Sequence, residues 1–459
     1  MDKRAMMDAL AREGFEKAGF NGTWLYAENG SVISKGAYGF SDAENKLPMR
    51  EDSIFEMASV TKMFTATAIM LLVRDGKLKL DDAYATVFPE FPYPEVTFRH
   101  LLTHTSGMPD DFNTDRWVVP VLENEHRIPQ NGEMLRFIRE SGEPLGHAPG
   151  EEFRYTDVGY TLLAEAVEKL SGVRFEEYLK KNIFEPAGMK DSGIYHTRRD
   201  GRPSDRFTRN MVLENGKYVP SDLSADAGYV VGSDGLNGCD YLYTTIFDML
   251  AWHKALREEK VLTLPEQKVM YTPGRLLNGE AAGADEDEND DGDDGYGFGW
   301  VVKHDAKLGL AVNHSGGMPG LETWFEHFVD ADRALVILNC RDCSDGKAYD
   351  AFFNGMRAIA YDRESEPVKT VEELAVCEPD RSAWESFCGK YDYDNWDFLA
   401  DEVFMKDGDL YIRLYYKTVC STLKLFPLGE KEFGIKPFSG NITFGDGTLT
   451  LWGKTANKL

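Results

Sequence analysis

A serine and a lysine three residues apart form the first pair in this sequence whose types and spacing suit covalent chemistry. Ser59 and Lys62 lie in residues 58–63, and Lys62 is the only charged residue between Glu56 and Arg74. Residues three apart share one face of a helix, and a lysine in apolar surroundings loses proton affinity, as a base for a serine hydroxyl must. The pair predicts a serine hydrolase that forms an acyl-enzyme.

Spacing alone is weak evidence for this pair, because the chain contains two further Ser-x-x-Lys tetrads, which begin at Ser344 and Ser421. Only Ser59 opens a long apolar segment, residues 57–73, which contains no glycine or proline. We expect this segment to form a buried helix whose first N–H groups face a developing oxyanion. The alternatives are that Ser59 only caps the helix and that Lys62 extends to the surface.

Two later segments carry further candidate groups. Tyr155 and Asp157 lie two residues apart, just before an expected helix at residues 158–170, and residues 313–317 end an expected strand with Asn-His-Ser-Gly-Gly. His104 offers an alternative, a Ser-His-Asp triad with Asp157 or another carboxylate. No Gly-x-Ser-x-Gly sequence surrounds the candidate serine, so we expect a structural role for this histidine.

In these segments the chain resembles the family of class C serine β-lactamases, penicillin-binding DD-peptidases, D-aminopeptidases and related esterases. The resemblance covers about residues 20–360 and also rests on residues 55–65, 101–107 and 296–300. It implies an α+β fold of the β-lactamase/transpeptidase type, in which helices flank an antiparallel sheet. Strand-like runs at both ends of this region agree with such a sheet.

The resemblance also implies a role for each matching residue. Ser59 is the nucleophile, Lys62 is its partner, and Tyr155 is the phenol that passes the proton to the leaving group. The backbone N–H groups of Ser59 and Gly317 form the oxyanion hole. The implied substrate-binding residues are Asp157, His314, Ser315 and Gly316.

At two positions the chain departs from the family pattern. Asp157 takes the third place of Tyr-x-Asn, and an ionised carboxylate accepts hydrogen bonds without donating them. A carboxylate near Lys62 also favours the ammonium form, which raises the lysine pKa and moves the base role toward Tyr155. His314, in the place of the lysine of Lys-Thr-Gly, is mostly neutral at pH 7. Both changes point away from β-lactams and toward D-aminopeptidases or esterases.

Length and pattern predict two domains in the 459-residue chain. Residues 1–367 form the expected β-lactamase-like serine hydrolase domain. Beyond residue 387, short apolar runs alternate with Asp-Gly and Ser-Gly turns, which is typical of a small all-β module. We therefore expect residues 368–459 to form a C-terminal, lipocalin-like or barrel-like module, similar to modules of D-aminopeptidase-like relatives.

Charge limits the partners of the protein. A formal net charge of -27 argues against nucleic acid and against anionic membrane surfaces. The longest apolar run, residues 63–73, has 11 residues, short of the about 20 that cross a bilayer. We expect a small-molecule or short-peptide substrate, no membrane association and, because no secretory signal is visible, a cytoplasmic location. A homo-oligomer stays open.

The sequence calls for no metal and no cofactor. Cys340 and Cys343 form a CxxC pair without a second pair of ligands. Eight of the ten residues at 285–294 are acidic and imitate the first half of a calcium-binding EF-hand loop, but its twelfth position is Phe298 instead of glutamate. We expect reduced cysteines and a solvated acidic loop.

The leading functional hypothesis is therefore hydrolysis of amide or ester bonds in small substrates, as in a D-aminopeptidase or an esterase. The alternative within enzymes is a β-lactamase or a D-Ala-D-Ala carboxypeptidase. The alternative from another class is a sensor or binding relative that is acylated without turnover.

Overall fold

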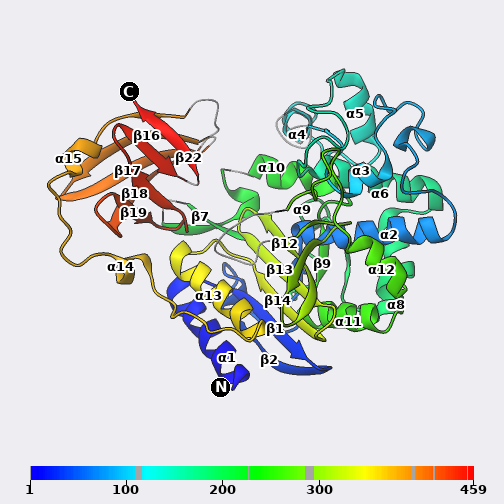
Figure 1. Ribbon diagram of the computed structural model, residues 1–459, viewed down its shortest axis with the longest axis horizontal. Coiled ribbons are helices and arrows are strands. Elements are labelled where there is room, and N and C mark those ends of the chain that lie inside the picture. The colour runs from blue at the N-terminus through cyan, green and yellow to red at the C-terminus, as the bar shows by residue number, and fades with distance from the viewer. Residues whose placement is uncertain are drawn as a thin grey trace. The chain divides into compact units, whose positions relative to one another are not determined.

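The structure is a computed structural model of the chain, and it describes residues 2–109, 116–214, 216–225, 227–284, 294–393, 398–416, 419–451 and 453–459 (Figure 1). The expected acidic loop lies outside the described residues, except for Asp294. The chain divides into two compact units. One comprises Gly22–Asn210 and Pro220–Cys340, and the other Met1–Asn21, Met211–Val219 and Arg341–Leu459. The expected domain boundary at residue 368 stays a prediction, because this division into compact units does not show which part of the chain folds by itself.

A seven-stranded antiparallel sheet forms the centre of the first unit. Its order is β10 (Gly295–Tyr296), β11 (Val301–Asp305), β12 (Gly309–Met318), β13 (Leu321–Phe328), β14 (Arg333–Asn339), β1 (Gly22–Glu28) and β2 (Ser31–Tyr38). β1 pairs with β14 in continuous register from Gly22 opposite Asn339 to Glu28 opposite Arg333. The predicted α+β fold, with a sheet built from both ends of the unit, is confirmed.

The hairpin of β1 and β2 turns at Asn29 and Gly30, whose φ angles are 51° and 75°. Both angles are in the left-handed region that a tight hairpin turn requires, and asparagine and glycine enter this region most readily. The Asn-Gly pair therefore forms the turn between these two strands.

The long apolar segment forms α2 (Thr61–Arg74), in which every residue from Thr61 to Leu72 is buried. A 3-10 turn, Ala58–Val60, precedes α2, so the α-helix begins later than the residue 57 expected from the apolar pattern. α6 (Asp157–Ser171) packs against α2.

The remaining helices of this unit are α3 (Phe98–Leu102), α4 (Val118–Glu125), α5 (Glu133–Ser141), α7 (Phe175–Leu179), α8 (Glu185–Ala187), α9 (Thr197–Asp200), α10 (Ala227–Gly232), α11 (Ile246–Arg257) and α12 (Leu264–Met270). Short strands form two small sheets, β3 (Phe40–Asp42) with β4 (Leu47–Pro48), and β5 (Phe55–Glu56) with β9 (Leu242–Thr244) and β6 (Gly193–Ile194). The second of these small sheets leads directly into the turn before α2.

The second unit contains an eight-stranded antiparallel sheet, drawn in orange to red in Figure 1. Its order is β15 (Tyr391–Asp392), β22 (Lys454–Lys458), β21 (Thr448–Leu451), β20 (Asn441–Phe444), β19 (Glu432–Ile435), β18 (Val419–Pro427), β17 (Asp409–Tyr416) and β16 (Phe398–Lys406). Gly389, just before β15, exchanges two backbone hydrogen bonds with Val403 of β16. The sheet is therefore nearly closed, and the predicted all-β, barrel-like element is confirmed.

The other elements of this unit are α1 (Lys3–Glu13), α13 (Gly346–Ala360), α14 (Val371–Leu374), α15 (Trp384–Phe387), β7 (Met211–Glu214) and β8 (Lys217–Pro220). Of the cysteines that the structure describes, five are free thiols: Cys239, Cys340, Cys343, Cys377 and Cys388. Across the described ranges, every helix is too short or too polar to span a bilayer.

Candidate active site

Ser59 lies in the 3-10 turn between β5 and α2 and is partly exposed. The turn is held by Met57, whose N–H donates to the Leu242 carbonyl at 2.8 Å. Ala58 has a φ of 43°, a conformation that is uncommon for residues other than glycine and that recurs at functional sites. α2 begins with no side-chain cap, so Ser59 does not act as the cap of this helix.

Lys62 is fully buried one turn into α2, so its side chain does not extend to the surface. Its Nζ donates to Ser59 Oγ at 2.9 Å, to Asp157 Oδ1 at 2.5 Å and to the Cys239 carbonyl at 3.3 Å. An ammonium group has three N–H donors, and here each one has an acceptor. The geometry is that of a protonated lysine.

The charge balance around Lys62 decides its pKa. Burial has the largest single effect and would lower the pKa of this amine, but the attractions of the surrounding acidic groups, Asp157 first, together outweigh it and hold the pKa well above its ordinary value. Asp240 adds to the same attraction. The pKa therefore moves in the direction expected from the carboxylate at position 157, and opposite to the direction expected from apolar surroundings alone.

Tyr155 lies over the same amine. Its ring centroid is 4.8 Å from Lys62 Nζ, and Lys62 and Ser59 both act on its phenol to favour the ionised form. The side chain is 37 % exposed, so it also borders the solvent. Desolvation raises the pKa of the Tyr155 phenol, and the positive charge of Lys62 offsets part of that rise.

His104 holds the segment that carries Tyr155 and Asp157. Its Nδ1 accepts from the Thr156 N–H at 3.2 Å, its carbonyl accepts from the Arg154 N–H at 2.8 Å, and its ring centroid is 4.2 Å from that of Tyr155. Burial keeps the pKa of this imidazole well below its ordinary value. Its Nε2 has no hydrogen-bond partner within the described ranges, so the ring does not activate Ser59 here.

His314 is buried in β12 with both ring nitrogens occupied. Nε2 lies 2.8 Å from Tyr296 Oη, and Nδ1 lies 2.5 Å from the Ser315 carbonyl. Burial, with repulsion from Lys62, lowers the pKa of His314 to about 4. The ring is therefore neutral at pH 7, when Nδ1 donates to the carbonyl and Nε2 accepts from the tyrosine.

The glycines that follow bring β12 against the serine turn. A Cβ on Gly316 would lie 2.1 Å from the Met57 carbonyl and 2.4 Å from Thr323 Oγ1, whereas a Cβ on Gly317 would meet nothing within 4 Å. Ser315 and Gly317 are exposed on one side of the strand, and Gly316 is buried on the other. Close packing therefore requires a residue without a side chain at position 316.

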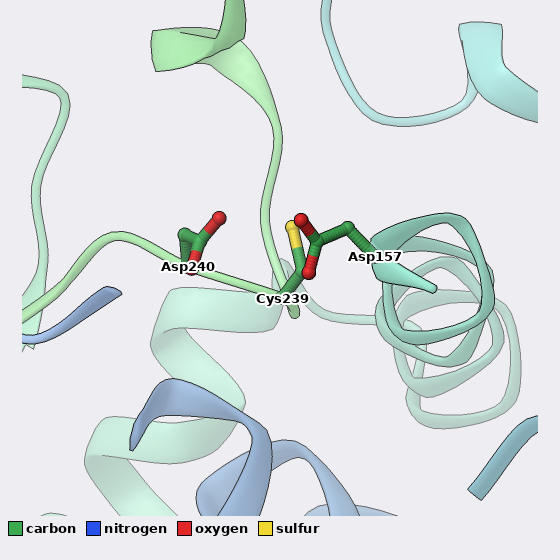
Figure 2. A group of neighbouring side chains, drawn as sticks. All are labelled: Asp157, Cys239 and Asp240. Carbon is green, nitrogen blue, oxygen red and sulfur yellow. The ribbon is translucent and has the colours of Figure 1, made fainter. Parts of the chain in front are cut away.

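Asp157 also belongs to a cluster of carboxylate and thiol groups that the sequence did not indicate (Figure 2). A carboxylate oxygen of Asp157, the sulfur of Cys239 and a carboxylate oxygen of Asp240 all lie within 4.8 Å of one another. The Lys62 ammonium already contacts this cluster through Asp157 and the Cys239 carbonyl, so a positive charge is present. No local pattern marks Asp240, because its neighbours come from α2 and α6.

Comparison with known proteins places this arrangement in a family. The Beta-lactamase family model matches residues 7–350. Penicillin-binding protein 4* of Bacillus subtilis (strain 168) is 29% identical over 445 residues, which cover 96% of this chain and 94% of that protein. The putative penicillin-binding protein PbpX of the same strain is 27% identical over 325 residues, which cover 70% of this chain and 71% of that protein.

Solved structures share the fold at lower identity. The octameric penicillin-binding protein homologue from Pyrococcus abyssi has a TM-score of 0.65 and 23% identity, with 100% of both chains covered. D-amino acid amidase from Ochrobactrum anthropi SV3, complexed with D-phenylalanine, has a TM-score of 0.61 and 20% identity, with 79% of this chain and 100% of that chain covered. The chain therefore belongs to the Beta-lactamase family, and it is a hydrolase of the superfamily of serine β-lactamases and penicillin-binding proteins.

Proposed function

We propose that the protein is a serine hydrolase that cleaves amide or ester bonds of small substrates through an acyl-enzyme on Ser59. The observation that carries the proposal is the position of one partly exposed hydroxyl, that of Ser59, beside Lys62 and Tyr155, which can stabilise or accept its proton. Ser59 Oγ accepts from Lys62 at 2.9 Å, and the Tyr155 ring centroid is 4.8 Å from the same Lys62 Nζ. A nucleophile, a proton acceptor and a fixed positive charge are the parts that acyl transfer requires.

Because all three N–H groups of Lys62 already donate hydrogen bonds, we assign the role of accepting the Ser59 proton to Tyr155. Because Lys62 is an ammonium that donates to Ser59 Oγ, the serine proton points away from it and toward the phenol. Tyr155 takes that proton as Oγ attacks the substrate carbonyl, and the positive charge of Lys62 stabilises the phenolate. The phenol then donates the proton to the departing amine or alkoxide. Water deacylates the enzyme by the same steps in reverse.

The charge that develops on the carbonyl oxygen needs donors in fixed positions. We assign this role to the backbone N–H groups of Ser59 and Gly317, as in an oxyanion hole. The packing of Gly316 against Met57 supports the assignment, since it holds β12 beside the serine turn. The open space at Gly317 leaves room for a substrate.

The substrate class follows from the charges beside the nucleophile. His314 is neutral at pH 7 and has protein partners on both ring nitrogens, so it offers no fixed positive charge to a substrate carboxylate. Asp157, Ser315 and Gly316 complete the proposed substrate-binding set. We favour aminoacyl amides or esters, as for a D-aminopeptidase or an esterase, over β-lactams and D-Ala-D-Ala peptides. The D-amino acid amidase neighbour is consistent with this choice.

A panel of acyl donors tests the proposal. The protein is incubated with p-nitrophenyl esters, D- and L-aminoacyl anilides and nitrocefin, and both product and intact mass are followed, with Ser59→Ala as the control. We expect turnover of esters or anilides, little turnover of nitrocefin, and an adduct that the control lacks. An adduct without turnover would support the sensor alternative. The absence of any adduct with every donor and with a fluorophosphonate would refute the proposal.

Location and assembly stay separate proposals. We propose a cytoplasmic protein that acts on a small-molecule or short-peptide substrate. A homo-oligomer is compatible with the octameric homologue, and the mass of this protein in solution would test it.

A further inference from the structure

A second carboxyl group, which is buried, lies near Lys62 and beside the carboxylate with which the lysine pairs. Asp240 is 5% exposed, and its Oδ1 has no hydrogen-bond partner among the residues that the structure describes. Its carboxylate, the Asp157 carboxylate and the Cys239 thiol lie within 4.8 Å of one another (Figure 2). Asp240 precedes β9, whereas Asp157 begins α6 and Lys62 lies in α2. Three separate segments therefore meet around one amine.

The charges of these groups do not balance when every acid is ionised. Two carboxylates would face one fully buried ammonium, and an uncompensated buried charge is costly. The site avoids that cost when Asp240 keeps its proton. Burial raises the pKa of the Cys239 thiol well above its ordinary value, so the thiol stays neutral and adds no charge.

The remaining group that faces Asp240 is already compensated. Glu56 of β5 repels the Asp240 carboxylate, but Arg198 pairs with Glu56 at 2.6 Å. The titratable groups around Asp240 are therefore Asp157 of α6, Lys62 of α2, Glu56 of β5 and Cys239 of its own segment. The excess charge arises from the two aspartates.

We propose that Asp240 is a positioning residue of the hydrolase, which controls acylation through its own proton. While it is protonated, the Lys62–Asp157 pair is neutral as a unit, and the Lys62 charge stabilises a Tyr155 phenolate. When it ionises, the added negative charge near Lys62 opposes the transfer of the Ser59 proton to Tyr155. This inference rests on the proposed function and adds to it a group that does not touch the substrate.

The acylation rate should depend on pH in the direction set by the protonated and ionised forms of Asp240. Burial, and then repulsion from Asp157, raises the pKa of Asp240 to about 7. The carboxyl group is neutral below that pH and ionised above it. The acylation rate should therefore fall as the pH rises through about 7. A side chain that cannot ionise at position 240 should remove this fall.

The test measures the second-order rate at which a fluorophosphonate modifies Ser59, followed by intact mass from about pH 5 to about pH 9. It compares the wild type with Asp240→Asn and Asp240→Ser, each shown to be folded by circular dichroism. We expect an alkaline limb with an apparent pKa of about 7 in the wild type. For either variant, the ratio of its rate to the wild-type rate should be about ten-fold higher near pH 8.5 than near pH 6.

Asp234→Asn is the matched control. Asp234 is a buried aspartate whose pKa burial also raises to about 7, but its principal charged neighbours are Arg198 and Glu56. The control should keep the alkaline limb of the wild type. An alkaline limb that is absent from the wild type, or unchanged in both Asp240 variants, would overturn the inference while leaving Ser59 acylation intact. No adduct in the wild type at any pH would overturn the proposed function and this inference together.

Discussion

At the scale of single residues, the charge of Lys62 organises the candidate site. A fully buried amine that donates to Ser59, Asp157 and the Cys239 carbonyl is already a cation, so it suits a stabiliser of negative charge better than a resting base. The same charge makes a phenolate on Tyr155 accessible despite the desolvation that opposes it. The ion pair of Lys62 with Asp157 therefore makes the lysine a stabiliser of negative charge and leaves the role of base to Tyr155.

Substitution of Tyr155 by phenylalanine tests this division. The change removes the hydroxyl that carries the serine proton and keeps the ring. We expect kcat for an ester substrate to fall by about 10²- to 10⁴-fold, the usual contribution of a positioned acid or base, with little change in the melting temperature. Near-native turnover in this variant would show that another group accepts the proton.

His104 acts on the same site through the backbone. It accepts from the Thr156 N–H and has a φ of 54°. Asparagine tolerates that backbone conformation and offers a side-chain acceptor, whereas phenylalanine offers none. We expect His104→Phe to lower kcat and to reduce the free energy of unfolding by about 1–3 kcal/mol, and His104→Asn to retain more of both. Equal losses would mean that ring packing alone accounts for the residue.

At the scale of elements, the distance between β12 and the serine turn is set by one missing side chain. Gly316→Ala would bring a Cβ to 2.1 Å from the Met57 carbonyl, so strand and turn must separate. We expect the free energy of unfolding to fall by about 1–3 kcal/mol, measured by urea denaturation, and acylation of Ser59 to slow. Gly317→Ala on the same strand meets open space and should leave stability unchanged. A stable Gly316→Ala protein with normal acylation would contradict this account.

At the scale of the whole molecule, the eight-stranded sheet has the features of an independent domain. Its core is built from residues between Trp384 and Ala456, among them Leu410 and Phe433, and Gly389 pairs with Val403 where the first and last strands of the sheet order meet. We expect a fragment of residues 368–459 to fold alone, with a β-type circular dichroism spectrum and a cooperative thermal transition. A disordered fragment would show that the predicted boundary near residue 368 does not separate two folding units.

Local patterns were sufficient to predict much of this architecture. An uninterrupted apolar run without glycine or proline has few options besides a buried helix, and α2 is such a helix apart from its first turn. Asn29 and Gly30 enter the left-handed region at low cost, so the first hairpin was predictable from two residues. The order of the serine, tyrosine and glycine segments was enough to indicate the family.

The sequence by itself thus determined the elements, the family and the principal candidates Ser59, Lys62 and Tyr155. Only the tertiary structure decided the balance of charge among them. The resemblance already predicted that Asp157 raises the pKa of Lys62, but nothing in the sequence connected Asp240 to this lysine, because electrostatic energy depends on distance in space and on exclusion of water. Apolar neighbours alone favoured a neutral amine, and the fold brings the Asp157 carboxylate to 2.5 Å from Lys62 Nζ, where it favours the cation.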